Sequence, residues 1–253
     1  MKLLLPLLAA FQLYTVQAQQ VDEEKLSEKH QIESQIRKRY YLDASNINFA
    51  ILPKDTLSGF FGIYSPWCDS LKLDYYNILR KTEKNSLSPD SLIARIMNHE
   101  LGHCHVDEIQ ERLGLKSVME NKYSRDLLEE YLKLLNTNNQ SMIDTTFQKF
   151  LNTKNKDLTT ILLDRMVNEG TALYYENPSI KPLHTSWPTS VNDIKTYDQY
   201  YMYIYSTGWN LMHPIISMYG DKGIEHVLKN MPRKEDFSDL QRYQKKILKE
   251  LAK

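Results

Sequence analysis

The chain has 253 residues, 42% of them hydrophobic and 25% charged, which is enough for one large domain with a substantial core. Its 32 basic and 32 acidic side chains cancel. This balance argues against nucleic acid or an anionic membrane surface as partner, because both are bound by an excess of Lys and Arg.

Residues 1–18, MKLLLPLLAAFQLYTVQA, have the features of a secretory signal peptide. Lys2 precedes an apolar run from Leu3 to Leu13, and Val16-Gln17-Ala18 has the spacing of a cleavage site. An uncleaved anchor is the alternative, but a membrane span needs about 20 apolar residues and this run is shorter. We therefore expect residues 19–253 to be secreted or periplasmic, without membrane insertion after cleavage.

The segments that follow predict a leading surface helix and then three strands. Residues 19–40 are polar and charged, with apolar residues at helical spacing. Residues 46–52, 59–65 and 70–78 are short, aromatic and β-branched, and turn residues separate them. These patterns predict a small N-terminal β-sheet.

From Ser88 onward, apolar residues recur with a period of 3.6, which predicts helices for the rest of the chain. The expected fold class is α+β. A lobe of residues 19–114 would hold a mixed sheet packed on a long helix, and residues 115–253 would form a mainly helical lobe of the same single domain.

The segment NHELGHCHVDEIQ, residues 98–110, holds three of the seven histidines of the chain. Ser88-Pro89-Asp90 is a typical helix start, and Gly114 is a natural stop. Within this predicted helix, His99 and His103 continue an apolar stripe that includes Leu92 and Ile96. Two histidines are therefore expected on the buried face.

His99 and His103 are one turn apart, about 6 Å along the axis, so both imidazoles can reach one metal ion. Glu100 lies about 100° around the helix and can approach a water on that ion without binding the metal. This is the chemistry of the HExxH motif, with two nitrogen ligands and a carboxylate base. His105 points about 200° away from His103 and is expected at the surface. The alternative is a polar helix whose histidines bind no metal.

A hydrolytic zinc site normally has three protein ligands. Asp107 continues the histidine stripe, but it lies about 12 Å along the axis from His99, which is too far for a shared ion. We expect it to accept a hydrogen bond from an imidazole N–H instead.

The predicted third ligand is Glu169, in the helical segment ILLDRMVNEGTALYYE, residues 161–176. It falls on an otherwise apolar stripe, where a carboxylate must be paired or coordinated. Gly170 beside it would let another backbone approach closely. The alternatives are a Glu169 carboxylate paired with Arg165 or with a buried tyrosine, and Glu176 as ligand in its place.

With these residues, the chain resembles the gluzincin branch of the HExxH zinc metallopeptidases, through HELGH at 99–103 and NEGTA at 168–172. The resemblance implies a zincin-like fold and one Zn²⁺ per chain, bound by His99, His103 and Glu169, with Glu100 as general base. It also implies a strand at the edge of the cleft that pairs with extended substrate, for which residues 70–78 are the expected match.

Related peptidases use a tyrosine or histidine downstream of the ligand glutamate to stabilise the transition state. Tyr205 and His213 are the candidates here, and His184 could instead line the substrate pocket. The alternative for residues 197–220 is a tyrosine-rich core helix kinked at Pro214.

The expected function is a secreted zinc peptidase that acts on peptides or proteins. The alternatives are a degenerate, metal-binding exported protein that serves as a binding module, and a helical interaction module whose HExxH is fortuitous. Cys68 and Cys104 could pair in an oxidising compartment or both be free.

Overall fold

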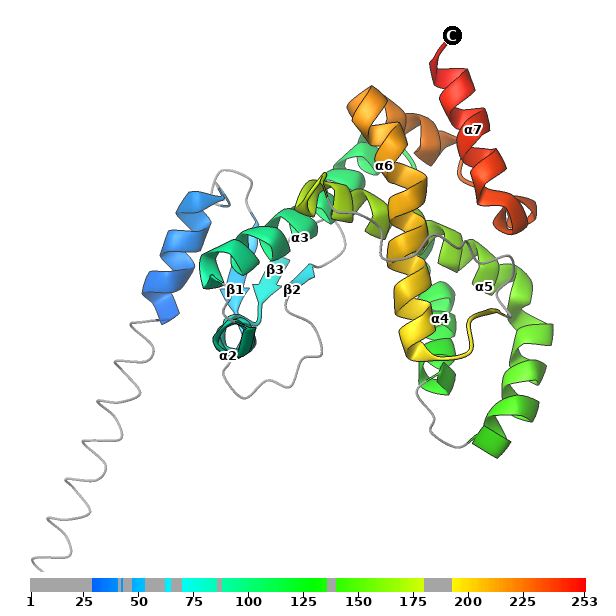
Figure 1. Ribbon diagram of the computed structural model, residues 1–253, viewed down its shortest axis with the longest axis horizontal. Helices are drawn as coiled ribbons and strands as arrows, with labels where there is room; N and C mark the ends of the chain where they lie inside the picture. Colours follow the sequence, from blue (N-terminus) through cyan, green and yellow to red (C-terminus); the bar gives the residue numbers. More distant parts are fainter. Residues whose placement is uncertain are drawn as a thin grey trace, which may run out of the picture.

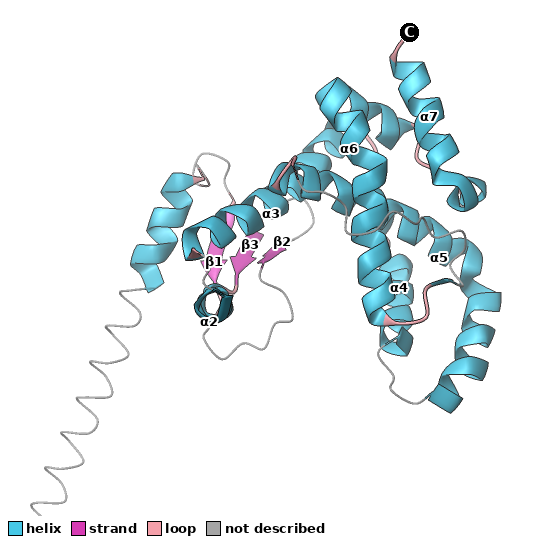
Figure 2. Cartoon of the chain, in the orientation of Figure 1, coloured by secondary structure: helices cyan, strands magenta, loops and turns pink. Residues whose placement is uncertain are grey.

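The computed structural model describes residues 29–40, 42, 47–52, 62–64, 70–85, 88–135, 140–179 and 193–253. The chain is mostly helical with one small sheet, so the expected α+β class is confirmed (Figures 1 and 2). In this part of the chain, every helix is too short or too polar to cross a lipid bilayer. The predicted signal peptide, residues 1–18, lies outside the described residues.

The sheet has three strands, β1 (Asn48–Ile51), β2 (Gly62–Tyr64) and β3 (Ser70–Leu73), in the order β1-β3-β2. Strand β3 runs parallel to β1 and antiparallel to β2, so the predicted mixed sheet is confirmed. A helix at residues 29–39 covers the outer edge of β1. There, Ile51 N–H donates to the Glu33 carboxylate at 2.8 Å, and Arg37 donates to the Phe49 carbonyl at 3.2 Å.

The strand predicted at residues 70–78 is correct only as far as Leu73, because helix α2 (Tyr75–Asn85) follows at once. The Asp74 carboxylate accepts the N–H of Asn77 at 3.0 Å, and this helix start ends the strand. Strand β3 is also the central strand, paired on both sides, so it cannot be the free edge that we expected. The outer strands of the described sheet are β1 and β2.

Helix α3 (Pro89–Arg112) has the predicted bounds. Ser88 is its N-cap residue, although the hydroxyl makes no capping bond, and Gly114 ends the helix with a φ of 66°. The N-terminal half of α3 packs against the core around the sheet. Its C-terminal half, through Val106 and Ile109, packs into a core shared with the last helices. The two predicted lobes therefore have this helix in common.

The remaining elements are a 3₁₀ turn (Val118–Glu120), α4 (Lys122–Leu135), α5 (Gln140–Glu176), α6 (Tyr197–Lys229), a second 3₁₀ turn (Lys234–Asp239) and α7 (Leu240–Leu251). Figure 1 shows the long helices α5 and α6 crossing each other, with α3 leading from their crossing to the sheet. Helix α6 continues through Pro214. Its dihedral angles leave the helical region at Gly220, six residues after the proline at which the alternative interpretation placed a kink.

Glycines allow α3, α5 and α6 to meet closely. A Cβ on Gly102 of α3 would lie 2.8 Å from the Cα of Ala172 in α5. A Cβ on Gly170 of α5 would lie 2.1 Å from the carbonyl oxygen of Gly208 in α6. Real Cβ atoms cannot come so near to backbone, so only glycine fits at these positions. The close approach expected at Gly170 is confirmed, and both crossings lie beside the predicted metal ligands.

Candidate metal centre

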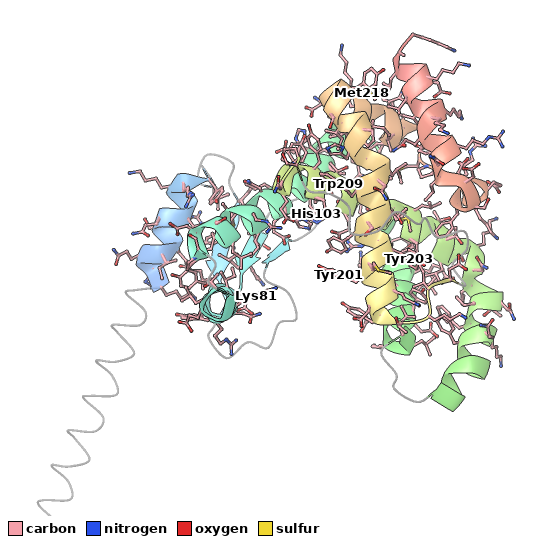
Figure 3. All side chains as sticks on the ribbon, in the orientation of Figure 1. Lys81, His103, Tyr201, Tyr203, Trp209 and Met218 are labelled. Atoms are coloured by element: carbon pink, nitrogen blue, oxygen red, sulfur yellow. The ribbon has the colours of Figure 1, made fainter. Side chains whose placement is uncertain are left out.

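His99 and His103 of α3 meet Glu169 of α5, 66 or more residues further along the chain. Their Nε2 atoms are 3.2 Å apart. The Oε2 atom of Glu169 lies 3.3 Å from His99 Nε2 and 3.5 Å from His103 Nε2. Glu169 is only 2% exposed. The site lies where α3 meets α5 and α6, close to the His103 label in Figure 3.

These distances fit a zinc ion. Zinc binds nitrogen and oxygen ligands at about 2.0–2.2 Å, and tetrahedral angles then place two ligand atoms about 3.3 Å apart. All three donor separations are close to this value. In addition, Glu169 Oε2 is buried, makes no hydrogen bond of normal geometry, and faces the two imidazole Nε2 atoms. Such an oxygen is costly unless a cation compensates it.

The ion pair with Arg165, which we considered as an alternative for Glu169, is present as well. Arg165 Nη2 donates to Oε1 of Glu169, whereas Oε2 faces the imidazoles. Burial by itself would raise the pKa of Glu169, but the charges of Arg165 and His103 outweigh it and hold that pKa well below its usual value. The carboxylate is therefore ionised, as a metal ligand must be.

Side chains of α5 lie next to Nδ1 of both imidazoles. His103 Nδ1 lies 2.5 Å from Oδ1 of Asn168, a partner that we did not predict from the sequence. His99 Nδ1 lies 3.3 Å from Oε2 of Glu176. The hydrogen bond at His103 Nδ1 directs the Nε2 lone pair of that ring to the common point, whereas His99 Nδ1 has Glu176 at ion-pair distance without a hydrogen bond.

Glu176 thus contacts a histidine, and it has a second partner of its own. Arg95 donates to its Oε1 from Nε at 3.0 Å and from Nη2 at 2.6 Å. Glu176 lies seven residues after Glu169, on the same side of α5, a spacing that could have indicated its position from the sequence. Nothing in the sequence indicated that Asn168 contacts His103. An asparagine that precedes a ligand in the chain can point in any direction, so its position next to Glu169 does not predict its partner.

Without metal, the site is an ion pair. Burial opposes the charged imidazole, but the carboxylates of Glu169 and Glu176 outweigh it and raise the pKa of His99 to about 10. A metal ion requires the neutral imidazole, so it would take the place of this proton.

Glu100, the predicted base, is next to the triad and is 7% exposed. Burial raises the pKa of its carboxyl, and the nearby charges of His103 and His99 oppose that shift. A carboxylate with a raised pKa is suited to accept a proton and to return it.

Tyr205 is the predicted donor that the structure brings to the triad. Its ring stacks on that of His99, with centroids 6.1 Å apart and 12° between the planes. Burial and the charge of Glu169 raise the pKa of Tyr205, so its hydroxyl keeps the proton and can donate a hydrogen bond.

His213, the other predicted donor, has its described contacts away from the His99, His103 and Glu169 triad. Its Nε2 lies 2.9 Å from the Pro178 carbonyl oxygen, and its ring packs against Trp209 and Tyr174. It is about 12 Å further along α6 than Tyr205. His184, the third candidate, lies outside the described residues.

Two neighbours of the ligands are accounted for in other ways. His105 points to the surface, as predicted, where Nε2 lies 2.8 Å from Oδ1 of Asp221. Cys104 is buried and disulfide-bonded. Cys68, the other cysteine of the chain, lies outside the described residues.

Comparisons with protein families, with curated proteins and with solved structures give no match to this chain. The metal centre is therefore argued from its own geometry.

Proposed function

We propose that the protein is an exported, zinc-dependent peptidase with a zincin-like fold, which hydrolyses peptide bonds at His99, His103 and Glu169. The observation that carries this proposal is the convergence of two Nε2 atoms and one carboxylate oxygen, 3.2–3.5 Å apart, in a buried place. The α5 side chains next to Nδ1 of both imidazoles support it, because metal-binding histidines characteristically have such partners.

Zinc at such a site lowers the pKa of a bound water towards 7 and polarises the carbonyl that is attacked. Side chains of the protein would transfer the proton and stabilise the transition state. Glu100 takes a proton from the attacking water and delivers it to the leaving amine. The protonated hydroxyl of Tyr205 donates to the developing negative charge on the carbonyl oxygen. Burial strengthens both interactions, because few water molecules compete for these groups.

Strand β2 is the place where an extended peptide would bind. One of its edges pairs with β3, and β2 is the strand that packs most closely against α3. A peptide added along the other edge would bind through main-chain hydrogen bonds, which do not depend on its sequence.

Export is supported by two independent features. The first 18 residues match a signal peptide, and Cys104 is disulfide-bonded, which is typical of proteins in oxidising compartments.

The test combines metal analysis with two variants of the protein purified without its first 18 residues. We expect one zinc per chain in the parent, in Glu100→Gln and in Glu108→Gln. Glu100→Gln should lower peptide hydrolysis by about 10²-fold or more. Glu108→Gln makes the same change on the same helix at a side chain that is 75% exposed, and it should be as active as the parent. Full activity of Glu100→Gln would refute the mechanism. Stoichiometric zinc without cleavage of any peptide would favour the metal-binding module.

A further inference from the structure

Three aromatic rings form a row from the solvent to the metal site. Tyr201 is 47% exposed, and its ring stacks on Tyr205 with centroids 4.2 Å apart and 25° between the planes. Tyr205 stacks in turn on His99 at 6.1 Å. Tyr201 and Tyr205 are one helical turn apart, so both lie on the same side of α6.

The helix that carries both tyrosines packs closely on α5 near the inner end of the row. Gly208, less than one turn after Tyr205, touches the backbone of α5 at Gly170, directly beside the ligand Glu169. This contact keeps the backbone of α6 near Tyr205 close to α5. Tyr201 therefore stacks on a ring carried by a closely packed helix, and about half of Tyr201 itself is exposed.

Such exposure is unusual among the described tyrosines. Tyr123 has a similar exposure, 45%, but Lys154 lies over its ring at 5.2 Å and its hydroxyl donates to Asp157. In the described part of the chain, the ring contact of Tyr201 is with Tyr205 alone. A half-exposed aromatic ring near a reactive site offers a place for a ring of the substrate, because offset stacking is favourable beyond the area that it buries.

We propose that Tyr201 binds an aromatic side chain of the substrate, so that the preferred substrates are peptides with Phe, Tyr or Trp near the cleaved bond. The inference rests on the proposed peptidase function and names the substrate class of that site. The two ring separations place Tyr201 within about 10 Å of the His99 ring, a distance that about three residues of extended chain cover. The recognised side chain therefore belongs to a residue within about three positions of the bond.

The test uses peptides of one sequence that differ at a single position, with Phe, Leu, Ala or Lys placed in turn at each of the three positions on either side of the bond. We expect kcat/KM to be highest for Phe at one of these positions. Tyr201→Ala should lower the preference for Phe over Ala by about two- to tenfold, the range expected for one aromatic pair. Tyr201→Phe keeps the ring and should keep the preference, and Tyr123→Ala, the matched exposed tyrosine, should leave it unchanged.

Other results would overturn the inference. If the parent cleaves all the peptides equally, or if Tyr201→Ala keeps the full preference for Phe, Tyr201 is not the recognition surface and the peptidase function still holds. A preference for Lys would also refute it, because the face would then bind cations. If the parent cleaves none of these peptides and no peptide in a complex mixture, the proposed function fails and the inference fails with it. If Tyr201→Ala does not fold, Tyr201→Leu replaces it. The preference for Phe over Ala should then be lower in Tyr201→Leu than in Tyr201→Phe, and equal preferences would refute the inference.

Discussion

Replacing Gly170 by Ala tests the close contact between α5 and α6 on which the geometry of the site depends. A Cβ there would lie 2.1 Å from the Gly208 carbonyl oxygen, whereas carbon–oxygen contacts normally begin at about 3.3 Å. The helices must separate by about 1 Å. Overpacking costs about 1–3 kcal/mol, and we expect the upper end because the obstacle is backbone. Alanine regains about 1 kcal/mol through its helix propensity, which leaves about 2 kcal/mol of destabilisation.

The assay is urea unfolding followed by circular dichroism, with a chelator present so that metal binding does not contribute to stability. The sign of the change is decisive. Helix propensity alone predicts that Gly170→Ala is more stable than the parent, and the steric contact predicts that it is less stable. Gly208→Ala is an independent repetition, because its Cβ would lie 2.2 Å from the Met166 carbonyl oxygen. If both variants were at least as stable as the parent, the helices could not cross as closely as described.

Three further predictions concern single side chains. Asn168→Ala should weaken zinc binding by about 10–100-fold, because Asn168 orients His103. Competition for zinc with a coloured chelator measures the affinity. An unchanged affinity would exclude this role of Asn168. Burial raises the pKa of Asp164 from 3.8 to about 6, so the folded state binds this proton more tightly than the unfolded state does. The stabilisation of the folded state by proton binding is therefore complete below pH 3.8 and is lost as pH rises through 6. Asp164→Asn should therefore gain up to about 3 kcal/mol over the parent at pH 8 and none from this source at pH 3.5, and urea unfolding that shows a constant difference would contradict this. Thr196→Ala should cost about 1 kcal/mol and lower Tm, because the Thr196 hydroxyl caps α6 by accepting the Gln199 N–H at 3.2 Å, and an unchanged Tm would show that the cap is not needed.

Within the described residues, the predicted strand segments are confirmed, but the end of one strand and the strand order were not predicted. All three predicted segments contain a strand, but the third one ends at Leu73 because Asp74 starts a helix. The central place of β3 could not be read from its residues. Strand order depends on pairing between segments far apart in the chain, and such pairing leaves no periodic trace within any one of them.

The kink in α6 shows the same limit for helices. Proline is the strongest sequence signal for a kink, yet helical angles continue past Pro214 and change at Gly220, where φ is 54°. Glycine permits that backbone conformation without requiring it. The surrounding packing decides where such a residue is used.

The sequence by itself determined the features that depend on local geometry. Helix bounds at 89–112 follow from end signals, and one turn of helix is enough to set His99 above His103. The apolar stripe around Glu169 likewise predicted a buried carboxylate, because burial on a helix repeats with its period.

Only the tertiary structure decided how these pieces meet. It brought Glu169 Oε2 within 3.5 Å of both Nε2 atoms, and it placed Asn168 and Glu176 next to the imidazoles. These contacts join helices that are more than 60 residues apart in the chain. Their geometry is set by the crossing of α3, α5 and α6 at glycines, and a crossing distance is a property of two packed surfaces rather than of either sequence segment.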